Sequence, residues 1–396
     1  MHLSLNLIDR CQLRVIAFWF VVGLAGQLLL HSLYPHSLEA IVRSDWANSY
    51  YNASLRYKAS DFLIHFPAIK QSLPIHAQSN MPGKILLYYG LRLITNNPRA
   101  LAILIIAISN LGGILLYFVV SNIYASRRIA LSSLLLYLFI PGKTYFLPLL
   151  NIVSPIPILA CLLLLVRFLE SRSKFLAVLL GIGFYVVLLF DPLTFCLGLF
   201  FVALIARSWW SEDVRITELL WLATMIAVGF LVINCAMWFG IGFNLVNRFR
   251  EVTGDAHAFS QGRPYLISLW ANLWEFSLSA GALPSLLCLI YLTTGLIAVS
   301  RSISAGYPIN RAIFSPLLSP GPLMFVTLLV TLASFDLTGL IRGEVVRLWI
   351  FIAVFVQVIA ADVCLENGRR WTLDIVLAGS IIQTAVAISM VGFILI

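Results

Sequence analysis

Charged residues are scarce in this chain of 396 residues. Only 11% of them are Asp, Glu, Lys or Arg, whereas 61% are hydrophobic, and the mean hydropathy is +0.96. Soluble domains carry about 25% charged residues, so this composition excludes a soluble globular or disordered class. The chain also lacks a low-complexity tract, a polar domain and a convincing internal repeat. The missing repeat argues against transporter folds built from two duplicated halves.

Cysteine is sparse as well, and its spacing excludes two kinds of site. The six cysteines stand singly, mostly within apolar runs, and no Cys-x-x-Cys pair is present. A zinc site or a disulfide framework would need such pairs. His65 and His76 also lack the spacing of a metal motif, so a neutral, hydrogen-bonded histidine is favoured at each position.

Long apolar runs fill most of the chain. About 20 apolar residues span a hydrocarbon core of about 30 Å, and uninterrupted runs are unlike the alternating strands of a barrel. The sequence therefore predicts an all-α polytopic membrane protein, a single transmembrane domain over 1–396. About eleven transmembrane helices are expected, at 11–33, 99–121, 128–147, 152–170, 175–190, 192–207, 216–239, 279–300, 320–341, 346–364 and 373–396.

The positions of the cations predict how the helices are oriented. Cytoplasmic loops carry an excess of Lys and Arg. If 34–98 is extracytoplasmic, five alternate short loops are cytoplasmic, and each carries at least two cations: Arg127-Arg128, Arg172 with Lys174, Arg207 to Arg215, Arg301 to Arg311, and Arg369-Arg370. The net charge of +9 then reflects topology and lipid headgroups, not nucleic acid. We expect a cytoplasmic N-terminus and a bacterial inner membrane.

Two polar segments share the predicted extracytoplasmic face. The first loop, 34–98, contains two short helical patterns, at 45–57 and at 83–95. The second pattern is apolar but too short to span a bilayer, which predicts a juxtamembrane or re-entrant helix. The second loop, 240–278, is rich in charged and aromatic residues.

Two carboxylates in the first loop are candidates for chemistry. Asp45 follows an amphipathic approach and could act as a general base or a metal ligand. An N-cap of the 45–57 helix is the alternative, because Asp accepts from free backbone N–H groups there. Asp61 has the same two interpretations in a weaker context.

Two junctions carry cations where an anion could bind. Ser79-Asn80-Met81-Pro82-Gly83-Lys84 is a turn before a short helix, and a helix N-terminus with a nearby lysine suits a phosphate. Arg342-Gly343-Glu344-Val345-Val346-Arg347 joins two spans on the same face. Arginine suits a phosphate, and Glu344 could orient Arg347; a structural ion pair or snorkelling side chains are the alternatives.

Residues 263–275 form an aromatic segment that begins Arg263-Pro264-Tyr265 and ends at Glu275. Tyrosine and tryptophan prefer headgroup depth, so a plain aromatic belt is one interpretation. A platform for a sugar or a polyprenyl chain is the other.

The order of these features resembles the GT-C class of integral membrane glycosyltransferases. Asp45 in Arg43-Ser44-Asp45-Trp46 stands where that class carries its catalytic acid. The turn at Ser79 to Lys84 is similar to the class's Thr-His-Pro-Pro-Gly turn, with Asn80 in place of histidine. The stretch from Gly343 to Trp349 is similar to its Gly-Glu-x-x-Arg junction. Departures are the missing Asp-Glu pair, since Trp46 follows Asp45, and the missing turn histidine.

The resemblance implies transfer of a sugar from a polyprenyl-phosphate donor to a glycan, lipid or protein acceptor. Asp45 would be the general base of an inverting displacement. Donor phosphate would be bound by Lys84, Arg263, Arg342 and Arg347, with support from Asp61, His76, Asn80, Tyr265, Glu275 and Glu344. No cofactor is certain, and a divalent cation, Mg²⁺ or Mn²⁺, is left open.

Two other classes stay open on the sequence alone. A transporter or flippase for a lipid-linked or small solute would carry ionisable residues in mid-span and broken helices. A scaffold subunit of a membrane complex would need neither.

Overall fold

The fold is all-helical in the computed structural model, which describes residues 4, 7, 11–260, 262–306, 308, 314–366 and 371–392. These residues contain helices and no strand. Eight segments are long and apolar enough to cross a membrane: Gln12–His31 (α2), Pro98–Tyr124 (α9), Leu150–Ser171 (ending in α12, Pro155–Ser171), Pro192–Trp210 (ending in α14, Gly198–Trp210), Ile216–Ile241 (α15), Ala282–Ser304 (α18), Pro320–Leu337 (α20) and Thr372–Met390 (α23). The prediction of a polytopic helical membrane protein is therefore confirmed.

The remaining three predicted spans form shorter helices. Residues 128–147 divide into α10 (Arg127–Leu138) and α11 (Pro141–Tyr145), because Pro141 lacks an N–H and disfavours a helical residue before it. Residues 175–190 form α13 (Lys174–Phe190), which has 17 residues. Residues 346–364 divide at Trp349 into α21 (Val345–Leu348) and α22 (Ile350–Glu366). The count of eleven spans stays a prediction.

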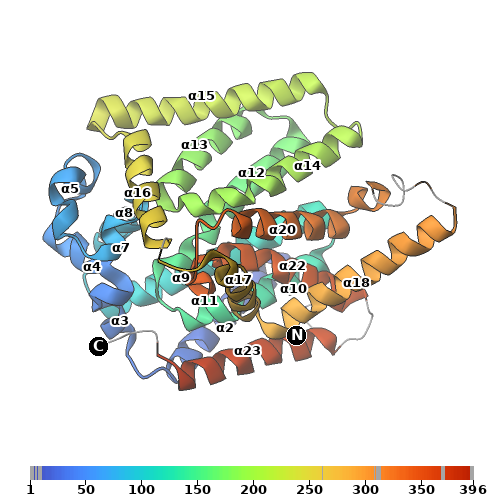
Figure 1. The fold of residues 1–396 in the computed structure, drawn as a ribbon, viewed down its shortest axis with the longest axis horizontal. Helices are drawn as coiled ribbons and strands as arrows, with labels where there is room; N and C mark the ends of the chain where they lie inside the picture. Colours follow the sequence, from blue (N-terminus) through green and yellow to red (C-terminus); the bar gives the residue numbers. More distant parts are fainter. Residues whose placement is uncertain are drawn as a thin grey trace.

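Short helices gather at one end of the bundle, which we call the Lys84 end (Figure 1). Residues 45–57 and 83–95 are helical as predicted, from Asp45 to Arg56 and from Gly83 to Arg92, and the 240–278 segment is also mostly helical. The helices at or beside this end are α3 (Leu38–Arg43), α4 (Asp45–Arg56), α5 (Ala59–Leu63), α6 (Phe66–Ile69), α7 (Ile75–Gln78), α8 (Gly83–Arg92), α16 (Leu245–Ser260) and α17 (Tyr265–Ala280).

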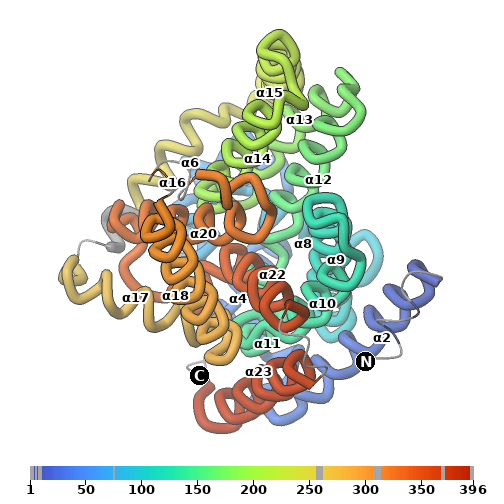
Figure 2. Tube along the Cα trace, turned by 90° about the vertical axis from the view of Figure 1, so that its right-hand side faces the viewer, coloured from blue at the N-terminus to red at the C-terminus, as the bar shows by residue number. Residues whose placement is uncertain are grey.

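Helix α22 lies in the middle of the bundle (Figure 2), and every residue from Ile350 to Cys364 is buried. Its Phe355 ring stacks on Phe200 with centroids 3.9 Å apart. Helices α13 and α15 approach closely through Gly181 and Gly229, since a Cβ at either would overlap a backbone carbonyl of the other helix. Small residues at helix crossings are typical of membrane bundles, where close van der Waals packing drives association.

Candidate functional site

A buried ion pair lies at the Lys84 end. Lys84 Nζ is 3.0 Å from Oδ2 of Asp191, and the two side chains are only 3% and 6% exposed. The same carboxylate oxygen accepts a 2.6 Å hydrogen bond from the Ser154 hydroxyl. Because buried charges are costly unless they are paired and hydrogen-bonded, this pair fixes α8 against the junction that follows α13.

Local sequence explains how α8 reaches that junction. Pro82 is the N-cap, and Gly83 is the first helical residue. A Cβ at Gly83 would lie 2.5 Å from the carbonyl oxygen of Leu189, near the end of α13. Only glycine permits this approach. The helix start is therefore packed against protein, and Lys84 points to Asp191 instead of presenting an open phosphate site as the turn suggested.

His76 connects the first loop to this pair. Its Nε2 lies 3.0 Å from the carbonyl oxygen of Trp46, and Asn80 donates to the His76 carbonyl at 2.9 Å. Lys84 Nζ donates to Oδ1 of Asn80 at 3.2 Å. Burial, and next the positive charge of Arg347, lower the pKa of His76 to about 4. A pKa this low favours the neutral form of His76 at physiological pH.

Arg347 approaches the same group from the other end of the chain. It forms an ion pair with Glu344, its neighbour on one helical turn, and its side chain is 15% exposed. Burial raises the pKa of Tyr50, while the charge of Arg347 acts to lower it and that of Asp191 to raise it further. We call Tyr50, His76, Lys84, Asp191 and Arg347 the Lys84 cluster.

Asp45 lies beside the Lys84 cluster, one residue before the Trp46 carbonyl that contacts His76. Its Oδ1 accepts from Asn52 at 2.9 Å, and its Oδ2 is 3.8 Å from Arg56; the side chain is 44% exposed. The cap of α4 is Ser44, whose hydroxyl accepts from a backbone N–H, so the alternative role of Asp45 as N-cap is wrong by one position. Asp45 thus remains accessible for chemistry.

Asp61 has a local partner. Its Oδ2 accepts a 2.9 Å hydrogen bond from the backbone N–H of Lys58, at the start of α5. The N-cap of α5 is Lys58, so the interpretation of Asp61 as an N-cap residue is wrong by three positions, although its carboxylate satisfies the N–H of the capping residue.

Arg263 and Arg342 each donate a hydrogen bond to the other's backbone carbonyl. Arg342 Nη1 donates to the Arg263 carbonyl at 2.9 Å, and Arg263 donates to the Arg342 carbonyl in return. Tyr265 donates to the Leu337 carbonyl at 2.7 Å, and Glu275 accepts from the Val345 N–H at 3.0 Å. These four predicted residues therefore hold the 337–347 junction that carries Arg347.

Arg248 was not among the predicted site residues, although it lies in the second predicted loop. It packs on the Phe66 ring, 3.0 Å from the ring centroid, and donates to the Asn80 carbonyl at 2.8 Å. Burial lowers its pKa to about 10. Lys70 and Asp255 add an ion pair of 2.7 Å between the same segments. Helix α16 thereby covers the turn that carries Asn80 and Lys84.

A second buried polar group lies inside the bundle. Lys143 Nζ donates to Oδ1 of Asn110 at 2.7 Å and lies 5.1 Å from the centroid of the Tyr137 ring. Asn110 and Gln27 exchange two hydrogen bonds of 3.0 Å. The side chains of Lys143, Asn110 and Gln27 are fully buried. Lys143 lies in α11, just after the break at Pro141, and the packed bundle encloses it.

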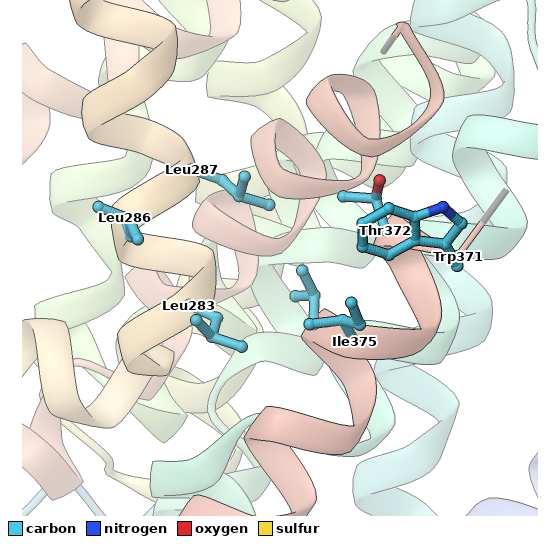
Figure 3. A pocket seen from close by; sticks show the side chains of 7 residues that line it. Leu283, Leu286, Leu287, Trp371, Thr372 and Ile375 are labelled. Atoms are coloured by element: carbon cyan, nitrogen blue, oxygen red, sulfur yellow. The ribbon is translucent and has the colours of Figure 1, made fainter. Parts of the chain in front are cut away.

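A cavity without charged residues lies elsewhere. It has a volume of about 510 Å³ and lies between α18 and α23 (Figure 3). Its lining is leucine, isoleucine, valine, threonine and one tryptophan. It contains no ionisable side chain, so it is not a centre for acid–base chemistry.

Metal binding has no support in the described part of the chain, where no three His, Cys, Asp or Glu residues form a group that could hold an ion. Asp191 is occupied by Lys84 and Ser154. The residues of the Lys84 cluster do not fit a divalent cation.

Comparisons with protein-family models, curated proteins and solved structures found no match. The fold and the site together define a polytopic helical membrane protein with a buried, charged cluster at one end of its bundle.

Proposed function

We propose that this protein is a membrane glycosyltransferase that uses a polyprenyl-phosphate sugar. One observation carries the proposal. The charges of Arg347 and Glu344, in the Gly343 to Arg347 junction, and of Lys84, at the start of α8, all act on the pKa of His76, although these segments are far apart in the sequence. Both segments resemble glycosyltransferase motifs, and Asp45 adjoins them.

The chemistry needs a base and a cationic site. The acceptor hydroxyl gives its proton to Asp45 as its oxygen bonds to the anomeric carbon. The bond from that carbon to the phosphate oxygen breaks, and polyprenyl phosphate leaves with the electron pair. Arg347, which is partly exposed, stabilises the phosphate charge. Lys84 is a positioning residue, because its pair with Asp191 holds the start of α8. Arg263 and Arg342 are positioning residues, because they hold the junction that carries Arg347.

Two purified variants test the proposal. Release of polyprenyl phosphate from polyprenyl-phosphate mannose and polyprenyl-phosphate aminoarabinose is measured with cell-envelope extract as acceptor. Asp45→Asn should lower the rate at least ~100-fold, the usual contribution of a general base. Asp61→Asn is the matched control, because Asp61 only accepts the Lys58 backbone N–H at the start of α5. Equal rates in folded Asp45→Asn and wild type would refute the role of Asp45.

A flippase or transporter is the second candidate, and the interior polar group favours it. An ionisable residue within the membrane usually marks a transport path, and Lys143 is an ionisable residue fully buried in the bundle beside two amide side chains. Translocation of a labelled lipid-linked sugar across reconstituted vesicles, without any glycosyl product and lost in Lys143→Met, would replace the enzyme with this function.

A further inference from the structure

A smaller cavity, with three charged residues in its lining, lies far from the Lys84 cluster, at the other end of α12 and α13. It has a volume of about 210 Å³, and it is lined by Phe168, Arg172, Lys174, Glu218, Trp221 and Met225. Helix α12 starts next to Ser154, which contacts Asp191, and α13 returns from Lys174 to Phe190. Each helix has 17 residues and is ~25 Å long, so the two sites lie at opposite ends of the bundle.

The charge around this cavity is positive. Glu218 supplies its only carboxylate, and Oε2 of that group already accepts the Arg215 backbone N–H at 2.8 Å. The other oxygen is 3.7 Å from Nε of Arg172. Two cations therefore face one carboxylate that is partly engaged elsewhere. A bound anion would neutralise the remaining positive charge.

Both cations are held in place by the fold. Arg172 has a left-handed backbone with φ of 57° after α12, and its Nη2 donates to the Asp213 carbonyl at 2.5 Å. The Lys174 ammonium lies 4.1 Å from the centroid of the Trp221 ring. Cation–π contact holds an ammonium without neutralising it, so Lys174 keeps its full charge for a ligand.

The rest of the lining is apolar and continues into an exposed apolar surface. Phe168 and Met225 complete the cavity. Along α15 only 11% of the spanning window is buried, and Leu220 and Val228 are 63% and 42% exposed. A free phosphate would contact only the cations. A molecule with a phosphate and acyl chains would contact both the cations and the exposed apolar surface of α15.

We propose that this cavity binds the headgroup of an anionic phospholipid. The phosphate contacts Arg172 and Lys174, the Trp221 ring lies at headgroup depth, and the acyl chains run along α15. Anionic lipids attract basic residues at a membrane surface; here the fold adds a cavity, an aromatic wall and an apolar track, which a loose cluster of cations lacks. The site is independent of the Lys84 cluster.

Native mass spectrometry of the full-length protein in detergent tests the site. It is titrated with palmitoyl-oleoyl phosphatidylglycerol, with phosphatidylcholine of the same chains, and with inorganic phosphate. Wild type should bind phosphatidylglycerol at least fivefold more tightly than phosphatidylcholine, and inorganic phosphate should not compete at equal concentration. Lys174→Gln should lower the affinity for phosphatidylglycerol about fivefold, because one cation near the membrane surface contributes about 1 kcal/mol. Trp221→Leu should also lower this affinity.

Arg167→Gln is the matched control, because Arg167 lies at the same end of α12 and pairs with Glu170 instead of lining the cavity. Its affinity for phosphatidylglycerol should stay at the wild-type value. Equal binding of the two lipids by wild type would overturn the proposal without any variant. If Arg167→Gln lost as much affinity as Lys174→Gln, general surface charge would explain the effect and the proposed cavity would not. Full competition by inorganic phosphate would overturn the lipid assignment.

Discussion

At the residue scale, the Lys84–Asp191 pair is the contact most sensitive to substitution. Both side chains are almost fully buried, and Ser154 provides the one additional hydrogen bond to Asp191 described above. Removing one partner leaves a buried charge without compensation, whereas removing both leaves a gap that apolar groups can fill.

Lys84→Met and Asp191→Leu should each lower the free energy of unfolding by about 3–5 kcal/mol, and the double variant should lose less than the sum of the two. Unfolding in SDS titrations measures all three. Lys70→Met is the control, because the Lys70–Asp255 pair is partly exposed and should contribute at most about 1 kcal/mol. Additive losses would show that Lys84 and Asp191 do not interact.

His76 predicts a dependence of stability on pH. Its pKa is about 4 in the fold, against 6.5 for an unperturbed histidine. Between these values the unfolded chain binds the proton and the folded chain does not, so stability falls as pH decreases from 6.5 towards 4. The thermal midpoint should be lower at pH 5.0 than at pH 7.5, which corresponds to a loss of roughly 1–2 kcal/mol in the free energy of unfolding.

In His76→Gln that loss should shrink, while in His65→Gln, whose side chain is exposed, it should persist. The same midpoint shift in His76→Gln as in wild type would assign the effect to another group.

At the element scale, α8 owes its position to one small residue. Gly83 lets the helix start touch the carbonyl of Leu189, whereas Gly90, on the same helix, has no atom within 4 Å of an added Cβ. Substituting Gly83 therefore tests close packing, whereas substituting Gly90 tests helix propensity alone, within the same helix.

Gly83→Ala should destabilise the protein by about 3 kcal/mol, because a backbone contact cannot relax easily. Gly90→Ala should stabilise it by about 0.5–1 kcal/mol, since alanine favours a helix. Thermal unfolding in detergent compares the two variants. If both have the same midpoint, α8 does not pack on α13 as described.

At the scale of the whole molecule, the two polar ends of the bundle should face opposite sides of the membrane. Ser60, in α5, and Ser211, after α14, are both exposed and lie at these two ends. Impermeant maleimide on intact cells should label Ser60→Cys. It should label Ser211→Cys only after permeabilisation. Cys235→Ser provides the background, because Cys235 is the one exposed cysteine of the six. Labelling of both positions from outside would contradict the predicted topology.

Composition and apolar run length alone determined that this chain is a helical membrane protein, because spanning a bilayer needs about 20 apolar residues in a row. Local pattern also predicted α4 and α8, whose turns and lengths are short-range properties. Only the tertiary structure decided which charged residue pairs with which. Lys84 meets Asp191, and Arg347 approaches His76, because packing around α22 brings distant segments together. No local spacing encodes which buried charge will need which partner, and the break at Pro141 that turns Lys143 inward has its effect only in the packed bundle.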